Sequence, residues 1–181
     1  MGMDDQIFEL RRVDGEHDLR SARALAKEYG QWAAQIAKAE YGIDAQAETE
    51  QGLSTSIDEL LRPRARLYVA YVEGVAVGIG GLKPVSHEVA EIKRMYVRPS
   101  ARGRGVGRAL MRKLLADVRE LDFRIVRLES AAFMTASHEL YRSVGFVHVP
   151  PFEGSEFAAI PGATDIQVFM QLDLDAPANP S

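Results

Sequence analysis

The stretch that decides the fold runs from Ala90 to Gly107 and reads AEIKRMYVRPSARGRGVG. Its first eight residues are typical of a β-strand, which Pro99 ends, and its glycine-rich end opens an amphipathic helix predicted over Gly105–Glu120. Glycine has no Cβ, so the backbone of such a turn can approach a ligand closely. Free N–H groups and the helix dipole favour an anion at a helix start. The stretch therefore predicts a strand, a phosphate-binding turn and a helix.

Basic residues are concentrated around this turn. Residues 91–127 carry 11 Lys and Arg against 4 Asp and Glu, whereas the whole chain has a formal charge of −4. A basic island in an acidic protein indicates a compact anionic ligand rather than long nucleic acid. Arg104, Arg108 and Arg112 recur at every fourth residue, so they form either a solvated stripe or a site for a phosphate group. Arg102 and Arg104 are expected to lie nearest the ligand.

Other classes of protein are disfavoured by what the sequence lacks. Arg108 stands where the dinucleotide-binding motif needs its third glycine, and the Gly-Lys-Ser/Thr of a P-loop does not occur. The chain has no cysteine, so it has no disulfide, thiolate metal site or cysteine nucleophile. No metal is predicted, because the histidines lack metal-ligand spacing. Surface or capping roles are expected for all of them: His17, His87, His138 and His148.

Length and composition indicate a single domain. The chain has 181 residues, of which 46% are hydrophobic and 27% charged. Residues 1–174 are predicted to form the domain, and the Pro- and Ala-rich residues 175–181 a flexible tail. The acidic start lacks the order of a signal peptide, and no apolar run reaches the roughly 20 residues of a membrane helix. A cytoplasmic protein without membrane contact is therefore predicted.

Hydrophobic periodicity predicts the remaining elements. Helices are predicted over residues 19–36, as one or two helices, through 57–61, and over 135–143. A tight hairpin at Glu73-Gly74 joins two of the predicted strands, and residues 42–50 are a predicted loop. Beyond 90–97, strands are predicted over 7–13, 67–73, 75–82, 124–131, 146–149 and 166–174. The fold class is therefore α/β (mixed α+β): a single twisted mixed sheet of about seven strands flanked by about four helices, in which 90–97 and 124–131 run parallel.

Three motifs in order resemble the GNAT superfamily of N-acetyltransferases. The first is R-x-x-G-x-G, at Arg102, Gly105 and Gly107, preceded by the strand 90–97. The second is ELYRSVGF at residues 139–146, and the third is the final strand at 168–174. The resemblance implies a twisted GNAT-like sheet in which strands 90–97 and 124–131 splay apart. It implies acetyl-CoA (coenzyme A) as co-substrate, with direct attack of a primary amine on the thioester.

The resemblance also implies where the cofactor binds. The main chain of one strand segment would hydrogen-bond the acyl and pantetheine groups, and the turn would bind the pyrophosphate. The strand residues are Met95, Tyr96 and Val97, and the turn residues are Arg102, Gly103, Arg104, Gly105, Val106, Gly107 and Arg108. Met134 stands where the family often has an Asn that meets the pantetheine arm, so Ser137 or a backbone group is expected to replace it.

Two residues are implied as catalytic. Tyr141 lies at the position of the frequent general acid, although a core tyrosine before a helix end fits equally well. Glu91 matches the strand carboxylate that some members use as a base, although it could be a solvent-facing glutamate paired with Arg94. Glu129, one strand away, is the rival, either as base or as a contact for the amine.

The acceptor is a small-molecule or peptide amine, and the sequence does not identify it. In the family the first helices line the acceptor site, where Tyr29 and Trp32 would suit a cationic amine, although both could belong to the core. The lack of an extended basic face argues against nucleic acid. A homodimer is predicted from the apolar residues Phe152, Phe157 and Ile160. The alternative to an enzyme is a non-catalytic CoA-binding or regulatory module with the same fold.

Overall fold

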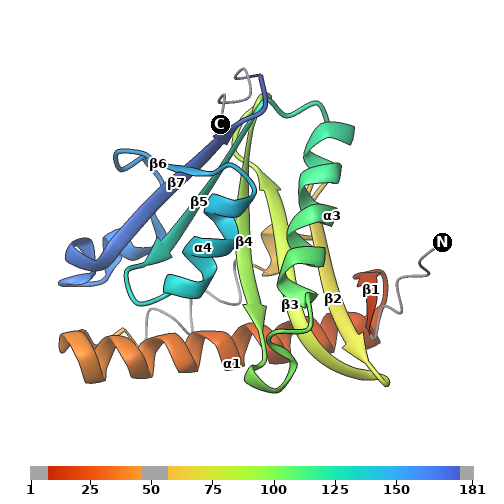
Figure 1. Ribbon diagram of the computed structural model, residues 1–181, viewed down its shortest axis with the longest axis horizontal. Helices are drawn as coiled ribbons and strands as arrows, with labels where there is room; N and C mark the ends of the chain where they lie inside the picture. Colours follow the sequence, from red (N-terminus) through yellow and green to blue (C-terminus); the bar gives the residue numbers. More distant parts are fainter. Residues whose placement is uncertain (1–7, 46–56, 176–181) are drawn as a thin grey trace.

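The computed structural model describes residues 8–45 and 57–175, which form one seven-stranded sheet with helices on both faces (Figure 1). The predicted tail 175–181 therefore lies outside the described residues except for Asp175, and the predicted loop 42–50 is described only as far as Ala45. Residues 57–59 are helical, as part of the short helix that was predicted there. The strands are β1 (Glu9–Arg12), β2 (Arg66–Val72), β3 (Val75–Pro84), β4 (Val89–Val97), β5 (Ile125–Ala131), β6 (Val147–His148) and β7 (Gln167–Asp173). The helices are α1 (Glu16–Tyr41), α3 (Val106–Glu120) and α4 (Thr135–Ser143), with 3₁₀ turns η1 (Pro99–Ala101), η2 (Glu156–Ala159) and η3 (Ala163–Ile166).

The sheet has the strand order β1-β2-β3-β4-β5-β7-β6. All neighbouring strands are antiparallel except β4 and β5, which are parallel. A parallel pair needs a crossover, and α3 supplies it between these two strands. The predicted mixed sheet and its parallel pair are confirmed.

The two faces of the sheet are covered by different helices. α3 and α4 bury one face, in a core that includes Leu110, Leu114 and Phe146. α1 covers the other face with buried apolar residues that include Leu25 and Ala26. α1 is one continuous helix of 26 residues, longer than predicted, because its last turns pack on a third cluster beside η2 and η3 rather than on the sheet.

The hairpin between β2 and β3 follows from its two turn residues. Glu73 has φ 49° and Gly74 has φ 79°, both in the left-handed region. A two-residue turn with positive φ at both residues matches the right-handed twist of the strands it joins, and glycine adopts positive φ readily. The predicted hairpin is confirmed.

β4 and β5 pair along only part of their length. The parallel register joins Val89–Ile92 to Ile125–Leu128 and goes no further, while β4 continues beside β3 and β5 beside β7. A bulge in β4, where Arg94 has φ 58°, accompanies the divergence. A Cβ on Gly80 of β3 would lie 2.7 Å from Met95 Sδ, so a larger residue there would displace the Met95 side chain. Figure 1 shows the two strands diverging toward the end of the sheet that α1 crosses, as the sequence predicted.

Candidate active site

A cleft of about 500 Å³ lies where β4 and β5 diverge. Its volume is in the range of small-molecule and cofactor sites. We call it the cofactor cleft. It is lined by Tyr29 and Trp32 of α1, by Met95, Tyr96 and Val97 of β4, by the turn residues Ala101, Arg102, Gly103, Gly105, Val106, Gly107 and Arg108, and by Phe133, Met134, Thr135, Ala136, Ser137, Leu140 and Tyr141 around α4.

The glycine turn presents backbone N–H groups to this cleft. Gly103 and Gly105 have φ 76° and 81°, which only glycine adopts without strain. Gly105 precedes α3, and the first hydrogen bond of the helix runs from Ala109 N to Gly105 O at 2.9 Å. The N–H groups of the residues between them have no acceptor within the helix. Free N–H groups and the helix dipole make this turn suitable for a phosphate group.

The arginines near the turn have different surroundings. Arg102 donates from Nε to the Val97 carbonyl at 3.1 Å, and its Cζ lies 5.7 Å from the Trp32 ring centre. Arg102 and Arg108 line the cofactor cleft, whereas Arg104 and Arg112 are exposed and do not line it. The contact predicted between Arg104 and the cofactor stays a prediction.

The two aromatic residues predicted for the acceptor lie in different places. Trp32 lines the cofactor cleft, in an aromatic group with Tyr29, Tyr96 and Phe133 whose ring centres lie 5.9 to 6.4 Å from its own. Tyr29 lines this cleft and the two smaller cavities described below. Of the two, Tyr29 is therefore the one that borders cavities beside the cofactor cleft, and the acceptor role of both residues stays a prediction.

Tyr141 borders the cofactor cleft from α4. Its side chain is buried, and it also lines the smaller polar cavity next to the cleft. Burial raises the pKa of Tyr141 well above the usual range, so the phenol keeps its proton at neutral pH. Met134, at the start of α4, accepts a hydrogen bond from the Tyr29 hydroxyl at 3.4 Å between O and Sδ. Ser137, the predicted substitute for the family's Asn, also lines the cleft.

A small cavity of about 30 Å³ adjoins the cleft at the point where the strands part. We call it the polar junction, because four charged side chains line it. These are Lys93, Arg94, Glu129 and Glu156. Tyr29, Met95, Met134 and Tyr141 line both the polar junction and the cofactor cleft, so the two spaces are direct neighbours.

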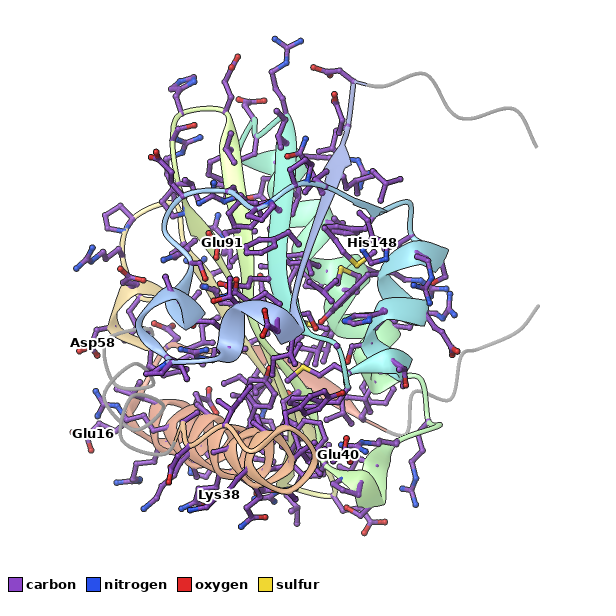
Figure 2. All side chains as sticks on the ribbon, turned by 90° about the vertical axis from the view of Figure 1, so that its left-hand side faces the viewer. Glu16, Lys38, Glu40, Asp58, Glu91 and His148 are labelled. Atoms are coloured by element: carbon purple, nitrogen blue, oxygen red, sulfur yellow. The ribbon has the colours of Figure 1, made fainter. Side chains whose placement is uncertain are left out.

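Glu91, the predicted base, is enclosed by cations. The residue is 1% exposed, and its carboxylate lies 2.7 Å from Lys93 Nζ and 3.2 Å from Arg127 Nε. The alternative of a solvent-facing glutamate paired with Arg94 is wrong, because β4 and β5 align Glu91 with Arg127 inside the sheet and Arg94 pairs with Glu156. Figure 2 places Glu91 within the sheet, far from the end of the molecule where α1 lies. Glu91 lines neither the cofactor cleft nor the polar junction, and its base role stays a prediction.

Glu129 has more direct access to the polar junction. It accepts hydrogen bonds from Ser155 Oγ and, at 3.1 Å, from the Glu156 backbone N. Burial raises the pKa of Glu129, and the hydrogen bond from Ser155 opposes part of that rise. A carboxylate whose pKa is raised is a better proton acceptor near neutral pH than an ordinary glutamate.

No motif or spacing in the sequence points to Glu156. Glu156 lies in η2, 62 residues from Arg94 in the sequence. Its Oε2 is 3.0 Å from Arg94 Nη1, and its Oε1 is 3.2 Å from Lys93 Nζ. Burial raises the pKa of Glu156, but the Arg94 and Lys93 cations outweigh it, so the pKa of this carboxyl is lowered on balance. Glu156 is therefore a carboxylate at neutral pH, and it binds two cations that β4 carries.

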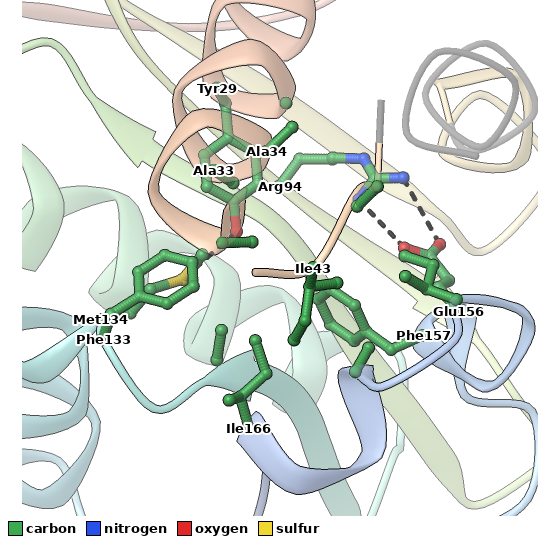
Figure 3. A pocket seen from close by; sticks show the side chains of 16 residues that line it. Tyr29, Ala33, Ala34, Ile43, Arg94, Phe133, Met134, Glu156, Phe157 and Ile166 are labelled. Carbon is green, nitrogen blue, oxygen red and sulfur yellow. Dashed lines mark hydrogen bonds and ion pairs between the residues drawn. The ribbon is translucent and has the colours of Figure 1, made fainter. Parts of the chain in front are cut away.

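A third cavity, of about 100 Å³, lies between α1 and the 3₁₀ turns η2 and η3 (Figure 3). We call it the apolar cavity. Five residues line both this cavity and the polar junction: Tyr29, Arg94, Met134, Glu156 and Phe157. Its other lining residues are Gly30, Ala33, Ala34, Ala37, Ile43, Ala45, Ala131, Phe133, Ile160, Ala163 and Ile166.

The apolar residues behind the predicted homodimer pack within this chain. Phe152 lies edge-on against Phe169 with ring centres 4.8 Å apart, and Phe157 and Ile160 pack in the cluster beside α1. Their apolar character is therefore explained without a partner, and the homodimer stays a prediction.

His138 differs from the surface or capping role expected for it. It is 6% exposed, and its Nε2 lies 2.9 Å from Ser130 Oγ. Burial lowers the pKa of His138, and Arg142 and His148 lower it further. The periodicity of α4 places this residue toward the sheet, where its ring is part of the core.

Within residues 8–45 and 57–175, no three His, Asp or Glu side chains gather as they would around a metal ion. None of the helices in these ranges is both long and apolar enough to span a membrane.

The fold and the site together define a class of enzyme. The two central parallel strands of the mixed sheet part beside a glycine turn at the start of a helix. The cleft between them fits an elongated ligand that carries phosphate groups. The buried Tyr141 phenol borders the cleft, and the Glu129 and Glu156 carboxylates line the polar junction beside it. This is the arrangement of an acyltransferase that uses a CoA thioester.

The chain belongs to the Acetyltransferase (GNAT) family, whose model matches residues 22–146. It is therefore an acyltransferase, and the resemblance drawn from the motifs is confirmed, as is acetyl-CoA as co-substrate.

Several curated proteins are similar to this chain. An uncharacterized N-acetyltransferase, YjgM, of Escherichia coli strain K12 is 31% identical over 121 residues, covering 61% of this chain and 70% of that protein. IAA acetyltransferase of Azospirillum brasilense is 32% identical over 97 residues, covering 53% and 63%. N-acetylaspartate synthetase of Xenopus tropicalis is 35% identical over 104 residues, covering 57% of this chain and only 37% of that protein.

Solved structures share the fold at low sequence identity. An acetyltransferase from Streptococcus agalactiae has a TM-score of 0.72 at 17% identity, covering 93% of this chain and 99% of that one. The PaiA N-acetyltransferase of Thermoplasma acidophilum, solved in complex with coenzyme A, has a TM-score of 0.69 at 16% identity, covering 92% and 98%. The yncA protein of Salmonella typhimurium, solved with its cofactor acetyl-CoA, has a TM-score of 0.61 at 22% identity, covering 97% and 98%.

Proposed function

We propose that this protein transfers the acetyl group of acetyl-CoA to the primary amine of a small molecule. One observation carries the proposal: the cofactor cleft extends from the glycine turn to the polar junction between the parted strands, where Tyr141 and Glu129 lie. Relatives that are named as N-acetyltransferases support it. The name of another relative, N-acetylaspartate synthetase, refers to a small N-acetylated product.

The cofactor would lie along the cleft with its pyrophosphate at the turn. The N–H groups of Val106, Gly107 and Arg108 would bind phosphate oxygens. On the side that faces β5, the main chain of Met95–Val97 has no ladder partner, because the ladder with β5 ends at Ile92, whereas its other side pairs with β3. Unpaired backbone groups in a protein interior need partners, and an amide-rich pantetheine arm supplies them.

The reaction would use two protein groups. The amine nitrogen attacks the thioester carbonyl carbon, the N–C bond forms and the C–S bond breaks. Tyr141 would give its proton to the departing thiolate, because its side chain borders both the cofactor cleft and the polar junction. We favour Glu129 as the group that takes the proton from the ammonium, because it lines the polar junction whereas Glu91 does not.

An amine panel tests the function directly. The protein is incubated with acetyl-CoA and single amines, and the released CoA thiol is measured with a thiol reagent. The chain has no cysteine, so the reagent reports CoA alone. Release that depends on the amine supports the proposal. Binding of acetyl-CoA by calorimetry with no amine turned over would favour a non-catalytic CoA-binding module instead.

The homodimer is tested separately. Light scattering at micromolar concentration is expected to give twice the chain mass of 20.0 kDa. A mass of one chain would discard the dimer and leave the enzymatic proposal unaffected.

A further inference from the structure

The apolar cavity has one charged side, formed by a single ion pair. Arg94 and Glu156 are the only charged residues among the described residues that line it, and their side chains are 11% and 32% exposed. Figure 3 shows the pair along one side of the cavity, opposite Phe133 and Met134. Because both residues also line the polar junction, the charged side of the cavity is the side nearest the reacting groups.

The charge balance of this pair limits which ligands can bind beside it. A ligand with only an ammonium or only a carboxylate would compete for one partner and leave the other less well compensated in a largely buried place, which is costly. A ligand that carries both charges on neighbouring atoms can join both ends of the pair and keep the region neutral. Its carboxylate would contact Arg94, and its ammonium would contact Glu156 and Glu129 at the junction.

The size and lining of the cavity limit the rest of the ligand. A volume of about 100 Å³ is smaller than the roughly 150 Å³ that holds a benzene ring in another protein. Alanine, isoleucine and phenylalanine side chains offer no partner to a charged or strongly polar group. The cavity therefore fits a branched aliphatic or thioether side chain, and it is too small for an indole.

We propose that the acceptor is a free α-amino acid with a medium-sized apolar side chain, of the valine, leucine, isoleucine or methionine type. This inference rests on the proposed function and names its substrate class. The α-ammonium loses one proton to Glu129 and its nitrogen attacks the thioester carbon. As the C–S bond breaks, Tyr141 gives its proton to the thiolate, and the second proton of the nitrogen restores the Tyr141 phenol. Glu129 then releases the first proton to solvent. The products are the N-acetyl amino acid, CoA and one released proton.

Matched acceptors test the inference. The thiol-release assay compares L-leucine with 3-methylbutylamine, which lacks only the carboxylate, and with L-tryptophan and L-glutamate. We expect kcat/KM for leucine to exceed that for 3-methylbutylamine by roughly 10- to 100-fold, the effect of one charge-assisted contact. Tryptophan and glutamate should be poor acceptors.

Two cavity variants and one control variant connect the preference to the cavity. Arg94→Gln/Glu156→Gln removes both charges together, so that neither is left alone, and it should reduce the leucine preference over 3-methylbutylamine to near unity. Arg124→Gln/Glu88→Gln removes an exposed pair 3.6 Å apart and should leave the preference unchanged. Ala33→Leu, which fills the cavity from α1, should lower kcat/KM for leucine more than for L-alanine.

The outcomes separate the inference from the function on which it rests. Turnover of 3-methylbutylamine equal to that of leucine would overturn the amino-acid acceptor and leave an acetyltransferase. If no amine releases thiol, calorimetry of L-leucine on the CoA-loaded protein decides. Binding that the Arg94/Glu156 double variant abolishes supports the amino-acid site, and absence of binding overturns it.

Discussion

Glu91→Gln distinguishes a catalytic from a structural role for the carboxylate in the middle of β4. The side chain is 2% exposed and contacts two cations, Lys93 and Arg127, at 2.7 and 3.2 Å. Removing one partner of a buried ion pair costs about 3–5 kcal/mol. Lys93 keeps Glu156 at 3.2 Å, and Arg127 keeps the Glu153 carbonyl at 3.2 Å, so we expect the lower end of that range.

The expected loss is therefore about 3 kcal/mol in the free energy of unfolding. At about 2–4 °C per kcal/mol for a chain of this size, Tm should fall by about 6–12 °C. Circular dichroism measures Tm, and kcat is measured at 20 °C with the amine that the panel identifies. We expect kcat of the folded variant to change by less than about threefold, because a general base would contribute about 10²- to 10⁴-fold.

Two controls belong to this experiment. Glu88→Gln removes an exposed carboxylate that lies 3.6 Å from Arg124, and it should change stability by less than about 0.5 kcal/mol. Glu91→Gln/Lys93→Met removes a cation together with the carboxylate and should recover part of the lost stability. An unchanged Tm with kcat reduced 100-fold, most strongly at low pH where the amine is protonated, would refute the structural role and make Glu91 the base.

Three other changes have expected outcomes. Gly107→Ala should weaken CoA binding, measured by calorimetry, because the added Cβ would lie inside the cleft where the backbone approaches the phosphates. The protein should stay folded, since this Cβ would lie 3.5 Å from Leu140, an ordinary contact. Unchanged affinity would place the phosphates elsewhere. Tyr141→Phe should lower kcat by about 100-fold across the pH range while the KM for acetyl-CoA stays nearly constant, and an equal loss of cofactor binding would indicate a packing role. The pKa of His138 is lower in the folded protein than in the unfolded chain, where it is about 6.5. The neutral, buried His138 therefore contributes fully to stability above about pH 6.5, and this contribution is lost as the pH falls below that value. A Tm that decreases from pH 7.5 to 5.5, and decreases less in His138→Gln, checks this, whereas equal slopes would assign the effect to other groups.

Most of the fold could be predicted from local patterns. The glycine turn after a β-rich run, the period-four apolar residues of α3 and the Glu73-Gly74 hairpin each depend on neighbours within a few residues in the sequence. The parallel pairing of β4 and β5 then follows from the helix between them. The extent of α1 could not be predicted, because its last turns pack on η2 and η3 from the far end of the chain.

The sequence by itself determined the family, the cofactor and the residues of the glycine turn. These are properties of a continuous segment, whose φ angles and helix start are fixed by residue type. Only the tertiary structure decided which carboxylates line the polar junction. Strand register places Glu91 between Lys93 and Arg127, and η2 brings Glu156 to Arg94 across 62 residues. Burial and partner charges decide whether a carboxylate can accept a proton, and both depend on which distant segments pack together.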